Sequence, residues 1–306
     1  MNYFLVLRPS QWIKNLLIFL PLILAQRFEI DLIIKCLQGI ILFSALASSI
    51  YIFNDIRDKD SDSNHPKKKF RPIASGEINL KIAYLLFCII SLSTLLISFL
   101  FYKEVFLLFF LYFILNILYT QILKKILIID ICLLSFFYIV RILSGSELTL
   151  IESSYWLISF SFFLFLYLSL LKRYNELLIL NQNFSNRPYK KNDKDLLLIL
   201  ATCIGLLSIL IFSLYLNSES AKLIYTNQKF LWFVNFILFY WTARILFLVN
   251  RGDCEIFKPC WKADSTYAKS LLSAQQCGVN LFAIKINWTL TGCYFDKELK
   301  IDLEKW

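Results

Sequence analysis

Acidic and basic side chains gather in one stretch, Asn54 to Gly76, which interrupts a sequence made otherwise of long apolar runs. Asn54, Asp58 and Asp62 are spaced i, i+4 and i+8, so they lie on one face if the preceding helix continues for two more turns. Asp55 lies beside them. Carboxylate and amide oxygens suit Mg2+, which commonly shares its coordination shell with substrate phosphates. The spacing therefore predicts a magnesium site formed by Asn54, Asp55, Asp58 and Asp62.

Basic residues follow these carboxylates directly, among them Lys67 and Arg71. Lys and Arg side chains can neutralise phosphate oxygens that a bound metal leaves uncovered. An acidic helix end followed by a basic loop therefore favours a site for a metal-bound phosphate, with Asp58 and Asp62 as candidate catalytic residues. The alternative is a solvated charged loop between two membrane helices.

Composition identifies the class of protein. Of the 306 residues, 58% are apolar and 17% are aromatic, which predicts a polytopic membrane protein. The net charge of +10 is expected to reflect loop topology and anionic headgroups, with no nucleic-acid partner. The N-terminal sequence lacks the pattern of a removable signal peptide, so the first apolar segment is expected to stay.

Apolar runs predict about eight membrane spans in an all-α helix bundle. The first contains Pro21 and is expected to cross only together with its flanks. The predicted spans cover residues 13–25, 32–53, 82–101, 105–122, 126–143, 155–171, 196–216 and 230–249.

Lys and Arg residues are distributed unequally between the two sets of loops. One face carries 17 of them and the other carries five, counting up to the last predicted span. The positive-inside rule therefore predicts that the acidic and basic stretch faces the cytoplasm in a multi-pass protein of the cell's inner membrane.

A second polar group lies between the fourth and fifth spans, with Tyr119, Lys124 and Asp130, and Arg141 follows deeper in the fifth. Ionisable residues within apolar runs usually line a cavity or pair with each other. Asp130 and Arg141 share a helix face but lie roughly 16 Å apart along the axis, so they cannot pair directly. The alternatives are that Asp130 caps the fifth helix and that Arg141 extends to the far interface.

The sequence NDIRDKDSD followed by NHPKKKFRPIASG resembles the first aspartate motif of the UbiA-type intramembrane prenyltransferase superfamily. Its flanking details resemble the decaprenyl-phosphate phosphoribosyltransferase branch. The resemblance covers about residues 8–253. It implies a UbiA-like bundle, usually of nine helices, that transfers the 5-phosphoribosyl group from phosphoribosyl pyrophosphate to a polyprenyl phosphate with Mg2+ as cofactor, for cell-envelope synthesis.

The same resemblance implicates further site residues. The segment YTQILKKILIIDICLL is similar to the second motif of the family, which implies roles for Tyr119, Lys124 and Asp130, with Lys124 and Asp130 as candidate catalytic residues. The remaining candidates, all for substrate binding, are Lys172 and Arg173 of LKRYNEL, Gln11, Lys14 and Asn15 of RPSQWIKN, and Lys67, Arg71 and Arg141. An ordinary cytoplasmic anchor of basic residues remains the alternative for Lys172 and Arg173.

The resemblance ends near residue 253. Half of the eight cysteines lie beyond it, and residues 254–306 contain no 18-residue apolar run in place of the family's last helix. We therefore expect two parts, a catalytic membrane domain at residues 1–253 and an atypical cysteine-containing tail at residues 254–306. Zinc binding by the tail is only weakly indicated, because no CxxC pair is present.

Two other functions remain open. A prenyltransferase that uses a prenyl diphosphate donor would use the same acidic motif to activate the diphosphate. A non-enzymatic lipid-binding or transport bundle would also explain the helices and the intramembrane charges.

Overall fold

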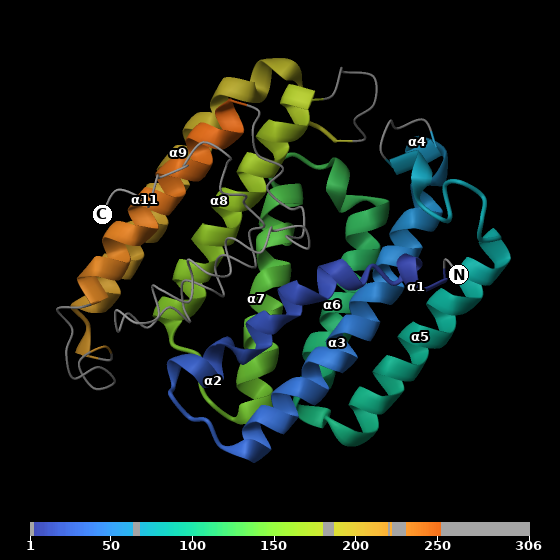
Figure 1. The fold of residues 1–306 in the computed structure, drawn as a ribbon, viewed down its shortest axis with the longest axis horizontal. Coiled ribbons are helices and arrows are strands. Elements are labelled where there is room, and N and C mark those ends of the chain that lie inside the picture. The colour runs from blue at the N-terminus through green and yellow to red at the C-terminus, as the bar shows by residue number, and fades with distance from the viewer. Residues whose placement is uncertain (1–2, 64–67, 180–186, 220, 222–230, 252–306) are drawn as a thin grey trace, which may run out of the picture. The chain divides into compact units, whose positions relative to one another are not determined.

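Seven apolar helices, each long enough to cross a membrane, dominate the part of the chain that the structure describes. The structure is a computed structural model, and it describes residues 3–63, 68–179, 187–219, 221 and 231–251. The seven helices are α3 (Ile30–Arg57), α5 (Leu80–Phe101), α6 (Lys103–Gln121), α7 (Ile129–Thr149), α8 (Tyr155–Ile179), α9 (Lys194–Leu216) and α11 (Leu231–Asn250) (Figure 1). No strand occurs among these residues, so the predicted all-α membrane bundle is confirmed.

The chain divides into two compact units, residues 1–243 and residues 244–306. Of the second unit, only residues 244–251 at the end of α11 are described. The predicted tail of residues 254–306 lies outside the described residues, so the predicted domain boundary stays a prediction.

The first predicted span differs from the expectation of an α-helix. After α1 (Tyr3–Val6), the chain forms a 3-10 helix, η1 (Pro9–Phe19), and a short α-helix, α2 (Leu20–Leu24). A 3-10 helix rises about 2.0 Å per residue and an α-helix about 1.5 Å. Eleven residues of the first kind and five of the second therefore reach roughly 30 Å, the thickness of a hydrocarbon core. Because a 3-10 helix rises more per residue, this segment covers that distance with fewer residues than an α-helix would need.

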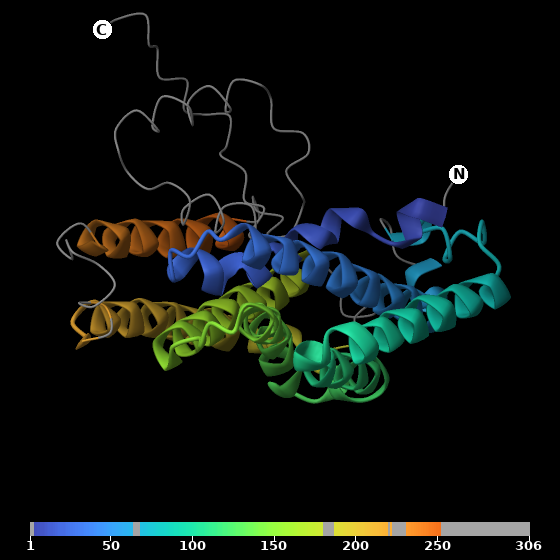
Figure 2. The ribbon, with the colours of Figure 1, turned by 90° about the horizontal axis from the view of Figure 1, so that it is seen from below.

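Helix α3 lies between the N-terminal segment and the next two helices. Elements η1 and α7 pack on α3, and α5 and α6 also contact it. Figures 1 and 2 show the dark-blue N-terminal segment on one side of α3 and α5 on the other. Helix α8 packs mainly on α7 and α9. Because α3 to α9 alternate in direction, the end of α3 lies at the same end of the bundle as the α6–α7 and α8–α9 connections.

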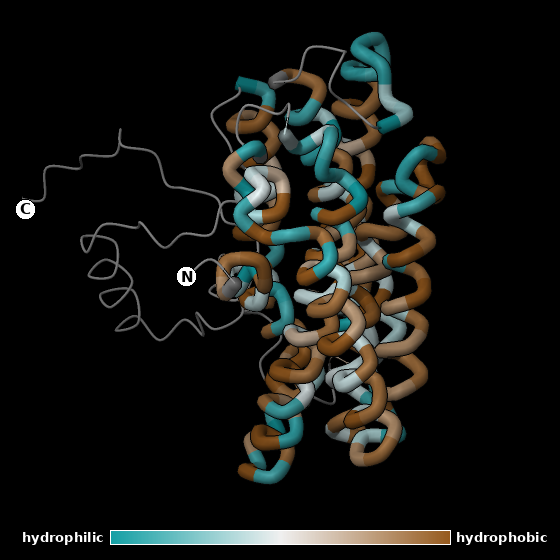
Figure 3. The backbone as a smooth tube through the Cα atoms, turned by 90° about the vertical axis from the view of Figure 1, so that its right-hand side faces the viewer, coloured by the Kyte–Doolittle hydropathy of each residue, from teal (hydrophilic) through white to brown (hydrophobic). Residues whose placement is uncertain are grey.

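Short helical segments occupy the connections at this end. They are α4 (Lys59–Ser63), η2 (Lys68–Phe70), η3 (Leu123–Lys125) and η5 (Lys191–Asp193). Hydropathy changes accordingly along the bundle, with apolar residues along the middles of the helices and hydrophilic residues mostly near their ends (Figure 3). Apolar side chains such as Leu92 on α5 and Leu210 on α9 are exposed, as expected for helices that face lipid.

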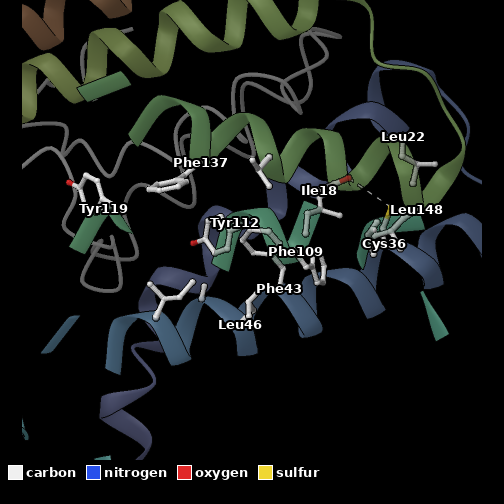
Figure 4. Packing of buried hydrophobic residues seen from close by; sticks show 14 of the residues in the cluster. Ile18, Leu22, Cys36, Phe43, Leu46, Phe109, Tyr112, Tyr119, Phe137 and Leu148 are labelled. Carbon is white, nitrogen blue, oxygen red and sulfur yellow. Dashed lines mark hydrogen bonds between the residues drawn. The ribbon is translucent and has the colours of Figure 1, made fainter. Parts of the chain in front are cut away.

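The main core of the bundle joins η1, α3, α6 and α7. Phe43 of α3 packs edge-on against Phe109 and tilted against Tyr112, both on α6, and Phe137 of α7 packs edge-on against Tyr112 (Figure 4). Ile18 and Leu22 bring the N-terminal segment into the same cluster. This core extends along most of the bundle, from Leu32 and Leu148 at one end to Tyr119 near the connections, so it holds α3, α6 and α7 relative to one another.

Gly145 allows η1 to lie against α7. A Cβ atom at Gly145 would fall well inside van der Waals contact of the Ile18 carbonyl oxygen. That contact is with backbone, so a side-chain rotation cannot relieve it. The close packing of the N-terminal segment therefore requires glycine at this position.

We expect Gly145→Ala to lower the free energy of unfolding by about 1–3 kcal/mol, because the added methyl group overpacks the η1–α7 contact. In an ordinary helix interior the same change would stabilise the protein by about 0.5–1 kcal/mol, so the two cases differ in sign. Thermal unfolding of the purified protein in detergent measures the effect, with the exposed neighbour Glu147→Ala as control. An unchanged or raised melting temperature for Gly145→Ala would show that η1 is not held in this way.

Candidate functional site

The acidic stretch forms a nearly continuous helical end. Helix α3 reaches Arg57, and α4 follows one residue later. The Asp58 N–H donates to the Asn54 carbonyl at 2.9 Å, and the Asp62 N–H donates to the Asp58 carbonyl at 2.7 Å. The predicted continuation of the helix is confirmed, so Asn54, Asp58 and Asp62 follow one another at successive turns.

Basic side chains hold each of the carboxylates in this stretch that were predicted to bind metal. Arg71 Nη1 lies 3.0 Å from Asp55 Oδ1 and 2.5 Å from Asp62 Oδ2, so one guanidinium bridges two aspartates. Lys124 Nζ lies 2.7 Å from Asp58 Oδ1. The structure therefore brings Arg71 and Lys124 to the acidic helix end, whereas Lys67 lies outside the described residues.

Arg8 is a further member of this group that sequence reasoning did not single out. Its guanidinium pairs with Asp55 and lies over the ring of Tyr51, 5.2 Å from the ring centroid. Arg8 has φ 49°, a left-handed conformation that is uncommon outside glycine, directly before η1 begins. No local pattern relates Arg8 to Asp55, because 47 residues separate them.

The oxygen atoms at this end match a hard divalent cation in type and in spacing along the helix. In the described residues, however, no three His, Cys, Asp or Glu side chains are already arranged around a common point. Asp55, Asp58 and Asp62 instead contact Arg and Lys, and Asn54 Oδ1 accepts a hydrogen bond from Thr120. The donor set fits Mg2+, provided that Arg71 and Lys124 release their carboxylates.

Asp130 is at the centre of a second charged network, and it is fully buried. Tyr119 donates its hydroxyl proton to Asp130 Oδ1 over 2.7 Å. Arg173 Nε lies 2.5 Å from Oδ2, and Arg187 Nη1 lies 2.6 Å from Oδ1. The interpretation of Asp130 as a helix cap is wrong, because Ile128 is the N-cap of α7 and the Asp130 side chain contacts these arginines.

Tyr119 and Asp130 of the second motif thus form one network with Arg173 of LKRYNEL. Arg173 also donates to Glu176 Oε2 over 2.6 Å, so its guanidinium joins two carboxylates. Because Arg173 is 1% exposed, the interpretation of this residue as a solvated anchor is wrong. Lys172 beside it is half-buried.

Arg187 is the second residue that sequence reasoning missed. It is one of several basic residues in a polar connection between α8 and α9, and no periodic pattern distinguishes it. Two positions on, the Tyr189 hydroxyl accepts a hydrogen bond from the Ile128 N–H over 3.2 Å. Burial raises the pKa of Tyr189 to about 12, so the phenol stays neutral. Together the two contacts fasten this connection to the α6–α7 connection.

Arg141 belongs to a separate polar cluster deeper in the bundle. It donates to Asn15 Oδ1 over 2.9 Å, to the Tyr112 hydroxyl over 3.2 Å and to the Phe137 carbonyl. Asn15 in turn donates to Ser44 over 2.8 Å. Because Arg141 is buried, the interpretation that it extends to the interface is wrong, whereas its separation from Asp130 is confirmed.

The remaining candidates of the lead-in lie along η1. The Gln11 N–H donates to the Arg8 carbonyl over 2.9 Å, and the Gln11 side chain is half-buried. Lys14 is also half-buried and lies within electrostatic range of Lys172, Arg141 and Arg8. Lys14 thus belongs to a cationic region between the deep cluster and the connections.

The described cysteines do not form a metal site. Cys36, Cys88, Cys132 and Cys203 are free thiols on different helices. The other four, Cys254, Cys260, Cys277 and Cys293, lie outside the described residues.

Comparison with known proteins gives two family matches in different parts of the chain. Residues 16–215 match the UbiA prenyltransferase family, and residues 240–292 match the sugar fermentation stimulation protein RE domain. The second match begins within α11 and extends into the residues predicted to form the tail.

Individual relatives agree with the first match. The decaprenyl-phosphate phosphoribosyltransferase of Mycobacterium tuberculosis is 31% identical over 176 residues, 56% of this chain and 58% of the relative. Nodulation protein NoeC of Azorhizobium caulinodans is 26% identical over 271 residues, 85% of this chain and 86% of the relative. The chain spans about half the length of several curated relatives that it matches.

A solved UbiA homologue from Archaeoglobus fulgidus, bound to DMAPP and Mg2+, has the same fold. It aligns with a TM-score of 0.65 at 14% identity, covering 95% of this chain and 99% of that one. The aspartates at the end of α3, the helical bundle and the match over residues 16–215 agree, and the chain belongs to the UbiA prenyltransferase family.

Proposed function

We propose that this protein transfers the 5-phosphoribosyl group from phosphoribosyl pyrophosphate to a polyprenyl phosphate and releases pyrophosphate. The observation that carries the proposal is the direct contact of Asp55, Asp58 and Asp62 with Arg71 and Lys124 at one end of the bundle. Such an arrangement offers ligands for a metal and cations for a diphosphate in one place. Relatives that are 31–35% identical and are named decaprenyl-phosphate phosphoribosyltransferases favour this pair of substrates.

Asn54, Asp58 and Asp62 would hold Mg2+, with Asp55 in support. When bound there, the ion supplies Lewis-acid stabilisation of the departing diphosphate. Asp55 has a supporting role because Arg8 and Arg71 both engage the same carboxylate. It fixes these two guanidiniums beside the metal ligands.

The chain's own cations carry the other part of the diphosphate charge. Arg71 and Lys124 neutralise its oxygens, together with Lys67. An oxygen of the lipid phosphate attacks C1 of the ribose, and the bond from C1 to the diphosphate oxygen breaks with its electron pair on the diphosphate. The lipid phosphate is already ionised at neutral pH, so no side chain has to act as a strong base.

The lipid phosphate is assigned to the cationic region of Lys14 and Lys172, with Gln11 nearby on η1. These two ammonium groups come from η1 and α8 and lie within electrostatic range of each other. Both ammonium groups attract an anion that binds there. The polyprenyl tail then lies against the apolar faces of the bundle. Asn15 and Arg141 stabilise this region, because the hydrogen bond between them holds η1 against α7.

Asp130 acts as a positioning residue in this proposal. Its Oδ1 accepts three hydrogen bonds, from Tyr119, Arg173 and Arg187, and its Oδ2 accepts one from Arg173. Because the carboxylate is also fully buried, we assign it a role through its arginines, in place of the direct catalytic role that the resemblance implied. Arg187, at 24% side-chain exposure, presents the network to the connections.

The active end is assigned to the cytoplasm and the protein to the inner membrane. Seventeen Lys and Arg residues on this side favour that orientation by the positive-inside rule. Phosphoribosyl pyrophosphate and Mg2+ are water-soluble and available in the cytoplasm, whereas the polyprenyl phosphate stays in the bilayer. The product would enter lipid-linked pentose chemistry for the cell envelope.

Transfer of a prenyl group is the second candidate, because solved homologues are bound to DMAPP and to GPP with Mg2+. One assay distinguishes the candidates. Purified protein in detergent is given labelled phosphoribosyl pyrophosphate, polyprenyl phosphate and Mg2+, and a parallel reaction contains a prenyl diphosphate and an aromatic acceptor. A lipid-linked pentose phosphate in the first reaction supports the proposal. Product in the second reaction alone would favour prenyl transfer, and none in either would favour a non-enzymatic bundle.

Asp58→Asn is expected to lower turnover at least about a hundredfold, because the amide replaces a charged ligand of the metal. Its melting temperature should change little, since the Asp58 side chain is about one-third exposed. The matched control is Asp60→Asn, the same substitution at an exposed position two residues on. Normal turnover in Asp58→Asn would contradict the metal assignment.

Asp130→Asn is expected to act mainly on stability, by about 3–5 kcal/mol, because it leaves Arg173 buried beside a neutral amide. Thermal unfolding in detergent measures this loss. Asp31→Asn, the same change at an exposed position on α3, should cost no more than about 1 kcal/mol. If Asp130→Asn lost turnover but melted like the wild type, Asp130 would have to act on the substrate directly.

A further inference from the structure

We propose that Arg71 and Lys124 are exchangeable counter-ions, which neutralise the aspartates before substrate binds and transfer to the diphosphate when metal and diphosphate bind together. This inference rests on the proposed function and adds a rule for the order of binding. Metal and diphosphate should each bind weakly alone and tightly together.

Lys124 and Arg71 compete with a metal ion for the same carboxylate oxygen atoms. Lys124 Nζ lies 2.7 Å from Asp58 Oδ1, and Arg71 Nη1 lies 2.5 Å from Asp62 Oδ2. Asp58 and Asp62 are two of the three proposed metal ligands. A metal ion that binds between them displaces the ammonium and the guanidinium, because like charges repel strongly at such distances.

A bound metal ion leaves the displaced Lys124 side chain in need of another negative partner. The Lys124 side chain is only 9% exposed, so its ammonium cannot simply move into water. A buried charge without an opposite charge is costly. Metal that binds alone therefore leaves Lys124 uncompensated, and an incoming diphosphate supplies the missing negative charge. By the same argument, diphosphate alone would draw Lys124 away and leave Asp58 without a cation.

Exposure to water distinguishes the ion pairs of Arg71 and Lys124 from the pair of Arg173 and Asp130. The Arg71 side chain is 30% exposed and that of Asp58 is 32% exposed, so one partner of each pair is open to water. Arg173 and Asp130 are 1% and 0% exposed, and their pair stays closed. The exchange is thus confined to the aspartates at the end of α3 and in α4.

Metal binding without turnover tests the inference. Mn2+ replaces Mg2+, and the free ion is followed by electron paramagnetic resonance in purified full-length protein, with and without inorganic pyrophosphate. We expect pyrophosphate to tighten Mn2+ binding at least about tenfold, and Mn2+ to tighten pyrophosphate binding by the same factor. All variants are measured in identical solutions, so complexes of Mn2+ with pyrophosphate in the buffer affect them equally.

Three variants at two adjacent lysines provide the comparison. Lys124→Met removes the competing cation, so Mn2+ alone should bind more tightly than in the wild type, and the effect of pyrophosphate should fall by a factor of about five or more. Lys125→Met removes an exposed lysine one residue away and should keep the wild-type coupling. Lys124→Arg keeps a cation at the site and should retain most of the coupling, which guards against a misfolded Lys124→Met protein.

The results also separate this inference from the proposed function. Equal Mn2+ affinity with and without pyrophosphate would overturn the exchange, while the transfer assay could still support the enzyme. Unchanged coupling in Lys124→Met would overturn the role of Lys124. Absence of Mn2+ binding under every condition would overturn both the exchange and the metal assignment.

Discussion

Charge compensation at one end of an apolar bundle is the constraint on which the site depends. Asp55, Asp62, Asp130 and Arg173 are all nearly or fully buried, and buried charges persist only when paired. Their partners come from distant parts of the chain: 47 residues separate Arg8 from Asp55, and 43 separate Arg173 from Asp130. Lys124 and Asp58 form a further pair, 66 residues apart. The ion pairs therefore tie η1, α3 and the α6–α7 connection together, so the site and the fold stabilise each other.

Local sequence patterns predicted the structural features that depend only on neighbouring residues. Long apolar runs predicted eight spans, and seven of them are helices long enough to cross a membrane in the described residues, because hydropathy over about 20 residues is sufficient for a membrane helix. The i, i+4, i+8 spacing predicted the successive turns of Asn54, Asp58 and Asp62, because those positions depend only on helix geometry. Lys124 and Tyr119 came from family resemblance, in one motif with Asp130. The structure pairs Tyr119 with Asp130 but pairs Lys124 with Asp58 of the first motif.

Long-range partners could not be predicted in this way. Arg8 and Arg187 lie in polar segments without periodicity, and nothing in their neighbourhoods relates them to Asp55 or Asp130. The 3-10 winding of η1 was missed for a similar reason. Element η1 packs on α3 and α7, with Ile18 close to Gly145, and these contacts join segments far apart in sequence. Composition alone made Arg141 a possible interface residue, whereas packing encloses it among aromatic rings.

The two charged networks differ in how much free energy it takes to open them. The pair of Asp58 and Lys124 is open to water on the Asp58 side, which is 32% exposed, so a ligand can enter and replace it. Separating Arg173 from Asp130 would cost several kcal/mol, because both groups are out of water. One network can therefore receive a charged substrate, while the other keeps the helix ends in place as charges move. An enzyme that joins a soluble diphosphate to a membrane lipid needs both properties, since its charged site must open without the bundle coming apart.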